Sequence, residues 1–248
     1  MKTSALFCLL ASAVSVHAGF VTWNAPQTIT GNGDVSTTGA LILAHNLGAS
    51  GNSSATVNGV TFTPFATNGP VNIAGNVRLS STANIPGDNV NFGDIVAPFS
   101  DLSPDYQTLL QSGSYTNGPF PPPDITLTLS GLSVGTSYQF QWWANQSSLS
   151  SFSPFPPPGG PATTAAAGGS VTLTRYSPAT EIGQFATGTF TADAASQVIT
   201  FSGGDTRTLL NAFQLRELPA SPIPEPGTAL FGIALAGVAL RSPSKRRR

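Results

Sequence analysis

The chain is poor in the residues on which many enzyme sites depend. Its 248 residues include one cysteine and two histidines, and charged residues make up only 8% of the chain. Cys8 lies in an apolar N-terminal stretch, so everything after it lacks a thiol for a disulfide or a thiolate metal site. His45 is the only histidine after residue 18. A Ser-His-acid triad would therefore depend on His45, and no Gly-x-Ser-x-Gly elbow accompanies it.

Positive charge is also missing from most of the chain. Between Gly19 and Ser221 there is no lysine, and four arginines stand against ten acidic residues, which gives a net charge of −6. Nucleic-acid binding needs clustered cations that displace counterions from phosphates, so this composition excludes nucleic acid as an expected partner. The remaining cations are Lys2 and a cluster at the C-terminus.

The N-terminus has the pattern of a secretory signal peptide. Lys2 supplies a positive charge, an apolar stretch runs from Ala5 to Val16, and small residues precede a predicted cleavage between Ala18 and Gly19. We expect residues 1–18 to form an apolar signal helix that is removed on export. With Cys8 removed as well, the stability of the mature chain would depend on core burial.

The C-terminus combines three features in a fixed order. Pro224, Glu225 and Pro226 form a stiff, extended motif, an uncharged apolar run spans residues 228–240, and a basic stop of Arg241, Lys245, Arg246, Arg247 and Arg248 follows. The run has no polar face, which is atypical of a soluble helix. At 13 residues it is shorter than the roughly 20 that span a bilayer, so local thinning or extension into the flanking residues would be needed.

This tail resembles the PEP-CTERM sorting signal of exported bacterial proteins. The resemblance implies that an exosortase-type membrane protease is the partner that recognises and cleaves the motif, after the inner membrane has held the apolar helix. It also implies a protein that ends at the cell surface or in the extracellular matrix. Residues 219–223 would then be a linker between a folded body, residues 19–218, and the sorting segment, residues 224–248.

The body is predicted to be all-β. Short runs rich in Val, Ile, Thr and Phe alternate with Gly, Asn, Ser and Pro, which is typical of strands and turns. One helix is expected at Pro104–Gln111, where Ser103 can cap the first turn and Tyr106, Leu109 and Leu110 share a face. Asn58-Gly59 could close a tight hairpin or mark a bulge. The expected strands are Gln27–Thr30, Ala40–Ala44, Ala55–Pro64, Val71–Ser80, Asp124–Leu132, Ser137–Ala144, Ser170–Tyr176, Gly183–Thr191, Ser196–Ser202 and Thr208–Leu218.

Ten strands without a βαβ rhythm indicate two packed antiparallel sheets. The body is similar to the jelly-roll, galactose-binding-like domains found on PEP-CTERM proteins. This resemblance rests on dispersed matches, among them Asn58–Phe62, Leu129–Tyr138 and Leu210–Arg216, and implies a fold rather than an activity. Two proline-rich segments, at 120–123 and from 155 through 169, are expected to be solvated loops.

A sugar site is the first binding hypothesis. Strand alternation sends Tyr138, Phe140 and Trp142 to one face of the strand and Gln139, Gln141 and Trp143 to the other. An aromatic plate beside amides can stack on a sugar ring and bond its hydroxyls, with Asn145 and Tyr115 as further candidates and an exopolysaccharide as the partner. The alternative is that Trp143 caps the sheet or packs under a neighbouring loop.

Carboxylates and amides suggest two further sites. Asp88, Asn89, Asn91 and Asp94 could hold a structural calcium ion, since calcium takes oxygen ligands, or could serve ordinary turns, which favour the same residues. Asp88, Asp94, Asp101 and Asp105 could also supply the acid pair of a polysaccharide hydrolase. The leading expectation remains a non-enzymatic exported protein without a cofactor, ahead of a carbohydrate-binding module and a hydrolase.

Overall fold

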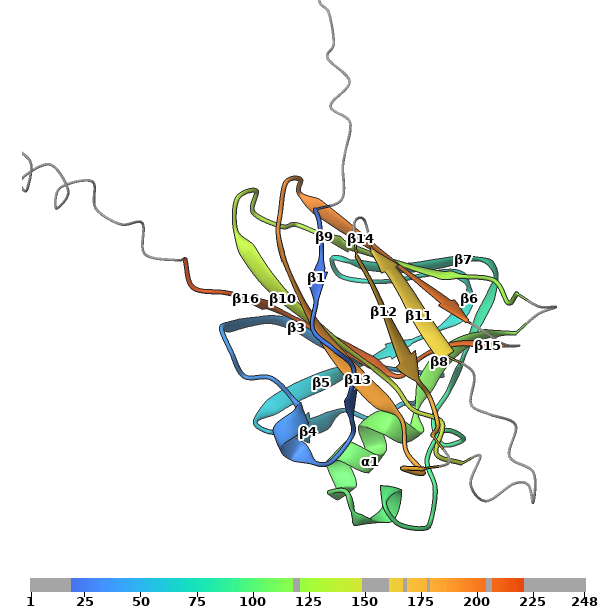
Figure 1. Cartoon of the computed structure of the whole chain (residues 1–248). Helices are drawn as coiled ribbons and strands as arrows, with labels where there is room; N and C mark the ends of the chain where they lie inside the picture. The colour runs from blue at the N-terminus through green and yellow to red at the C-terminus, as the bar shows by residue number, and fades with distance from the viewer. Residues whose placement is uncertain are drawn as a thin grey trace, which may run out of the picture.

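Two eight-stranded sheets face each other in the computed structural model, which describes residues 19–117, 121–148, 161–166, 169–177, 179–203 and 207–220 (Figure 1). The first sheet has the order β1-β13-β10-β16-β3-β5-β4, with β2 paired to β13. The second has the order β12-β11-β14-β9-β7-β8-β15, with β6 paired to β7. The predicted all-β, two-sheet architecture is therefore confirmed. The predicted signal helix and C-terminal apolar helix lie outside the described residues.

The bounds of the elements are as follows. The first sheet contains β1 (Thr22–Trp23), β2 (Gln27–Thr28), β3 (Ala40–Gly48), β4 (Ala55–Val57), β5 (Val60–Ala66), β10 (Ser137–Ala144), β13 (Gln184–Thr191) and β16 (Ala212–Glu217). The second contains β6 (Asn68–Ala74), β7 (Val77–Asp88), β8 (Gly113–Asn117), β9 (Ile125–Ser130), β11 (Pro161–Ala166), β12 (Gly169–Thr174), β14 (Ser196–Gly203) and β15 (Arg207–Leu210). The helical elements are η1 (Asn32–Asp34), η2 (Phe99–Asp101) and α1 (Pro104–Gln111).

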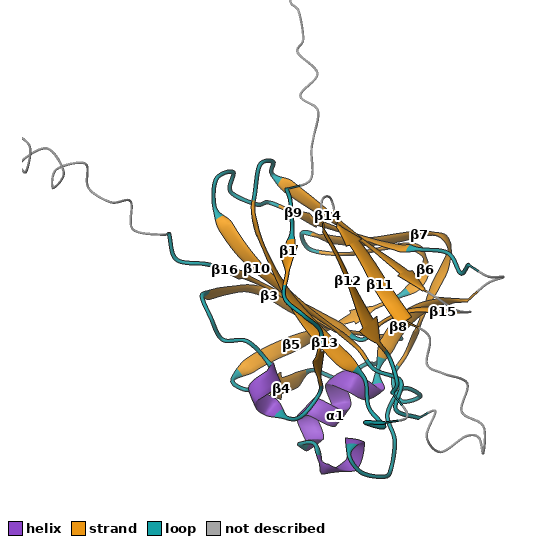
Figure 2. Ribbon diagram, viewed as in Figure 1, coloured by secondary structure: helices purple, strands orange, loops and turns teal. Residues whose placement is uncertain are grey.

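The predicted helix is confirmed as α1. Ser103 Oγ accepts a hydrogen bond from the Tyr106 amide, Pro104 occupies the first turn, and Tyr106, Leu109 and Leu110 are buried. These are local signals, since a cap, a first-turn proline and one apolar face suffice to define a short helix. Figure 2 shows the helical segments gathered at one end of the strands, which we term the helical end.

One strand pair departs from the predicted antiparallel arrangement. Asn58 and Gly59, with φ of 50° and 74°, close the β4–β5 hairpin, so the hairpin alternative for Asn58-Gly59 is correct. This hairpin inserts β5 rather than β4 beside β3, and β5 consequently runs parallel to β3.

Other corrections concern strand boundaries. The segment Val71–Ser80 is two strands, because Gly75 and Asn76 form a turn between β6 and β7. The segment after Pro161 was expected to continue a solvated loop, but β11 lies between β12 and β14 and pairs with both. Pairing on both sides satisfies its backbone polar groups despite a sequence with little apolar patterning.

The core has two parts, one on each face of the first sheet. Tyr138, Phe140 and Trp142 belong to the larger cluster between the sheets. Trp143 belongs to a second cluster with Phe62, Tyr106 and other residues under α1. The predicted alternation along β10 is therefore confirmed. Near α1, β10 is buried on both faces, and this burial bears directly on the predicted sugar site.

Candidate functional site

Trp143 is fully buried and unavailable to a sugar. Its exposed fraction is 0%. Its ring stacks on that of Phe185 and packs edge to face against that of Phe62. Its indole Nε1–H donates to Tyr106 Oη at 3.0 Å. The prediction that Trp143 stacks on a sugar is wrong, because α1 and β5 cover the face on which it lies.

The two glutamines of the predicted site hold a neighbouring segment instead. Gln141 accepts from the Ser36 amide at 2.9 Å and donates to the Asp34 carbonyl at 2.6 Å. Gln139 accepts from Ser36 Oγ. The chain from Asp34 to Ser36 therefore crosses the outer face of β10, and the amide side chains serve as its hydrogen-bond partners.

The other two candidate sugar-binding residues, Asn145 and Tyr115, do not form an open site with Trp143. Asn145 is fully buried, with its amide donating to the Phe92 and Leu110 carbonyls. Tyr115 lies with Arg207, whose guanidinium carbon is 4.6 Å from the Tyr115 ring centroid. The structure does not bring these side chains together with Trp143 at a surface.

A chain of hydrogen bonds links Trp143 to Asp34 through Tyr106. Tyr106 Oη accepts from Trp143 and donates to Asp34 Oδ2 at 3.0 Å. Asp34 also accepts from the amides of Thr30 and Gly31. Burial, together with the charge of Asp34, raises the pKa of Tyr106 well above its usual range. Tyr106 therefore stays protonated and remains the donor to Asp34.

Asp88, Asn89 and Asp94 of the predicted calcium loop accept hydrogen bonds from protein amides. Asp88 accepts from the amides of Val90 and Asn91 and from the Asn91 side chain. Burial opposes the ionised form of Asp88, but these hydrogen bonds and the charge of Arg207 together lower its pKa. Asn89 Oδ1 accepts from the Ala49 amide at 2.7 Å, and Asp94 Oδ1 accepts from the Ile95 amide. The Asp88 contacts are those of an ordinary Asx turn, whereas Asn89 joins this loop to the chain just after β3.

In the described part of the chain, no three His, Cys, Asp or Glu side chains come together as metal ligands would. Calcium binding at Asp88, Asn89, Asn91 and Asp94 thus remains a prediction from the sequence.

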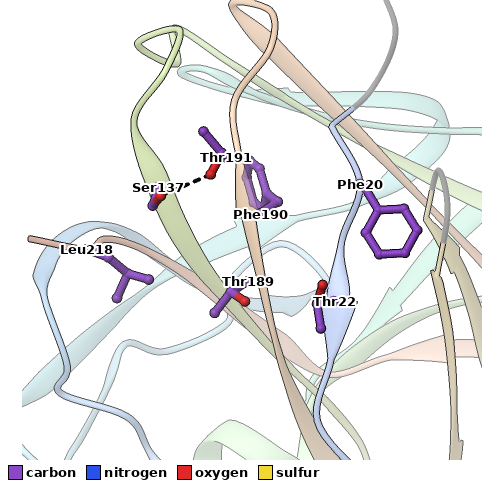
Figure 3. A pocket seen from close by; sticks show the side chains of 7 residues that line it. All are labelled: Phe20, Thr22, Ser137, Thr189, Phe190, Thr191 and Leu218. Atoms are coloured by element: carbon purple, nitrogen blue, oxygen red, sulfur yellow. Dashed lines mark hydrogen bonds between the residues drawn. The ribbon is translucent and has the colours of Figure 1, made fainter. Parts of the chain in front are cut away.

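Residues near both ends of the described chain line one cavity, at the opposite end of the sandwich from α1 (Figure 1). This cavity of about 460 Å³ is lined by Phe20, near the start of the described chain, and by Leu218, just after β16. In Figure 3, Leu218 and Phe20 lie at its two sides, with Thr22, Thr189 and Phe190 between them. Ser137 and Thr191 close one side through a hydroxyl–hydroxyl contact of 3.0 Å. The lining carries hydroxyl groups and apolar side chains but no ionisable one.

The N-terminal side of this cavity is packed from Gly19 onward. The Gly19 carbonyl accepts from Gln197 Nε2 at 3.1 Å, and Val21 is fully buried in the core between the sheets. A Cβ at Gly19 would lie 2.7 Å from the Thr191 carbonyl oxygen, so a larger residue has little room there. The residue predicted to follow signal cleavage is thus part of the folded body.

A second groove, of about 380 Å³, lies on the other side of the end of β16. Ile42, Leu43, Leu215, Leu132 and Tyr138 supply apolar walls, and Glu217 lies at its rim. Successive residues of a strand normally face opposite ways. Here Ile42 and Leu43 both line the groove, because the β3–β16 register shifts between Leu215 and Arg216. Such a bulge redirects a side chain.

His45 also lines this groove. Its ring is 5.4 Å from that of Phe65 and 5.5 Å from that of Phe213, and Nδ1 lies 3.1 Å from Thr63 Oγ1. Burial lowers the pKa of His45, against a smaller opposing effect of the hydrogen bond with Thr63. Ser130, Ser133 and Glu217 also line the groove, but the hydrogen-bond partner of the His45 ring is Thr63 rather than any of these three.

The lowered pKa of His45 predicts a loss of stability in mild acid. An unfolded chain protonates this histidine near pH 6.5, whereas the folded chain does so only at lower pH. As pH falls below about 6.5 the unfolded state binds more protons, so the free energy of unfolding decreases until the folded pKa is passed. Urea unfolding at pH 7.5 and 5.5 measures this decrease.

The matched variant for that measurement is His45→Gln, which keeps a polar side chain and removes the titration. Its stability should change less between the two pH values than that of the parent chain. Equal changes in both proteins would contradict the assignment to His45.

No family model matches this chain, and searches of curated proteins and of solved structures found no match either. Among the helices that the structure describes, none has the length and apolar character needed to cross a membrane. The sorting motif Pro224, Glu225 and Pro226 and the basic stop lie outside the described residues, as does Ala18 of the cleavage site.

Proposed function

We propose that this chain is an exported, non-enzymatic protein of the bacterial cell surface or extracellular matrix, sorted by its C-terminal segment. The observation that carries the proposal is the order of the tail: Pro224-Glu225-Pro226, then the apolar run 228–240, then five basic residues from Arg241 to Arg248. The apolar run enters the inner membrane, the cations stay on the cytoplasmic side, and an exosortase-type protease cleaves at the motif. The jelly-roll assignment of the body belongs to the same proposal.

Two structural features support it. The body is packed from Gly19, where signal cleavage is predicted, and its last strand, β16, ends at Glu217, just before the predicted linker. Phe20 and Leu218 line the same cavity. The chain segments that carry the two predicted cleavage sites therefore join the body at the same end. A body with this arrangement can remain folded while both ends are cut.

Processing is tested in a bacterial host that carries an exosortase system. The parent chain should yield a species that starts at Gly19, ends between Pro224 and Pro226, and is found in the envelope or extracellular fraction, as measured by intact mass and fractionation. Replacing Pro224, Glu225 and Pro226 together by alanine should abolish that species and leave a membrane-bound chain that retains Arg248.

The matched control replaces Pro219 and Pro222 by alanine, which alters two prolines just before the motif. It should be processed as the parent is. A parent chain that keeps Arg248, or that stays in the cytoplasm with residues 1–18 attached, would refute the proposal.

A further inference from the structure

The end of the sandwich from which both described chain ends leave carries large apolar side chains in contact with solvent. We term it the terminus end; Figure 1 shows α1 at the opposite end of the strands. The exposed fraction is 63% for Phe20, 49% for Ile42, 68% for Ile73 and 66% for Val134. Exposed apolar residues also occur near the helical end, at Val90, Ile95 and Val96. Exposure alone therefore does not distinguish the two ends, and the position of the C-terminal tether decides which end faces a membrane.

Contacts place these residues at the same end. Val134 lies in the β9–β10 turn, two residues before Thr136, whose carbonyl accepts from the Ala192 amide. The next residue, Ser137, accepts from the Leu218 amide at 2.8 Å. Ile42 shares its groove with Ala74 and Glu217, and Ala74 directly follows Ile73. The apolar side chains thus surround the point at which β16 ends.

The bulge in β3 exposes Ile42 at this end. Ile42 is the extra residue of the register shift between β3 and β16, and it lines the groove beside Leu43. Regular alternation would allow only one of Ile42 and Leu43 to face that groove. The exposure of Ile42 is therefore built into the backbone.

The terminus end is nearly neutral, unlike the rest of the body. Its described charged groups are Arg78, paired in register with Ile73, Asp193 in the β13–β14 turn, and Glu217. Arg216 is buried. The helical end carries Asp101 in η2 and Asp105 in α1, and Glu181 lies between two residues that share a pocket with Asp101. Asp94 and Glu181 both lie close enough to Tyr176 to affect its pKa. The terminus end therefore has no strong electrostatic preference for or against a neutral lipid interface.

The length of the chain beyond the body fixes how far this end can lie from a membrane. Seven residues, 221–227, separate Ala220 from the apolar run that begins at Thr228. Seven residues span at most about 25 Å when fully extended. With the run held in a bilayer, the terminus end is tethered close to the lipid surface, and such tethering raises the local concentration of weakly binding apolar groups.

We propose that the terminus end docks on the lipid surface of the membrane that holds the C-terminal segment, with Phe20, Ile42 and Val134 in the interface. This inference rests on the proposed function. It directs the helical end, with α1, away from the membrane. Because the docking surface is near neutral, binding to zwitterionic lipid should change little with salt concentration.

The test places a fluorophore at each end of the tethered protein. In a Cys8→Ser background the chain has no cysteine, so Val134→Cys and Ile95→Cys each give one labelling site. Ile95 lies near the helical end with an exposed fraction of 89% and serves as the matched control. The chain, with its C-terminal segment retained, is reconstituted into phosphatidylcholine vesicles that contain a headgroup spin label. Quenching should be severalfold greater at position 134 than at position 95.

The outcomes separate this inference from the proposed function. Protein that floats with the vesicles but shows equal or no quenching at the two positions would refute docking while leaving the anchor intact. Protein that does not float would refute the anchor. At higher protein density, energy transfer between labelled copies could replace the quenching at position 134. That result would assign this end to a second copy of the chain and overturn the lipid assignment. Loss of quenching in the variant Phe20→Ser/Ile42→Ser would support insertion of these side chains.

Discussion

Replacing Trp143 by alanine is expected to lower the free energy of unfolding by about 3–5 kcal/mol, the range typical of large aromatic side chains in cores. The indole is fully buried and packs against Phe62 and Phe185 on one side of the first sheet. The same change removes the donor to Tyr106 Oη. Both effects act on the cluster that joins α1 to the sheet.

Urea unfolding of the parent and the variant measures this loss, with an unchanged slope showing that the folded state stays compact. Trp143→Phe reduces the packing contribution, because it keeps a smaller aromatic ring in the cluster while it removes the N–H. We expect it to cost about 1–2 kcal/mol, since it leaves the buried Tyr106 hydroxyl oxygen without its donor. A Trp143→Ala protein that unfolds like the parent and loses affinity for a polysaccharide would instead restore the sugar-binding hypothesis.

The sequence predicted elements whose signals are local. The cap at Ser103 and the apolar face of Tyr106, Leu109 and Leu110 lie within one short segment, and they predicted α1 with the bounds that the structure shows. Asn58-Gly59 is likewise a turn signal in two residues. Along β10 the alternation correctly divided Trp142 from Trp143, because neighbouring side chains on a strand must face opposite ways.

What covers each face could not be predicted from the same signals. The group that binds the Trp143 indole, Tyr106, is 37 residues earlier in the chain, and Ser36, which binds Gln141, is 105 residues earlier. Alternation separates the two faces of a strand, but the burial of the second face depends on such distant contacts. One feature of the sequence did indicate that this face is buried. Gln139 and Gln141 share a face with Trp143, and their amides are as well suited to bind a crossing backbone segment as to bind a sugar.

The missed strand β11 and the unexpected parallel pair have the same origin. β11 has no clear apolar alternation and was assigned to a proline-rich loop, yet its backbone is paired by strands on both sides. β5 lies beside β3 because of where the β4–β5 hairpin docks, which its own sequence does not specify. Pairing partners of a strand are set by the whole chain rather than by its local composition.

Asn145→Leu should be the second large loss of stability, about 3–5 kcal/mol, although leucine is similar in size to asparagine. The Asn145 amide donates to the Phe92 and Leu110 carbonyls, and its Oδ1 accepts from the Gly183 amide at 3.0 Å. Leucine would leave the buried Gly183 amide without a partner, which costs about 1–3 kcal/mol. It would also remove one of two donors from each of the Phe92 and Leu110 carbonyls, which Ser147 and Asn211 also bind, and each lost bond costs about 1 kcal/mol. The side chain joins the end of β10 to three separate segments, so the loss should also loosen their packing.

The matched control is Asn24→Leu, because Asn24 also makes a side-chain hydrogen bond, to Thr187 at 2.8 Å, but at an exposed site. There water can replace the lost partner, and the change should stay within about 0.5 kcal/mol. Urea unfolding of both variants gives the comparison. If Asn145→Leu were as mild as Asn24→Leu, the network around Asn145 would not hold the helical end together, and Asn145 would again be open to a role in binding. A loss confined to Asn145→Leu instead makes the second face of β10 a structural layer, and leaves the terminus end as the surface on which to look for function.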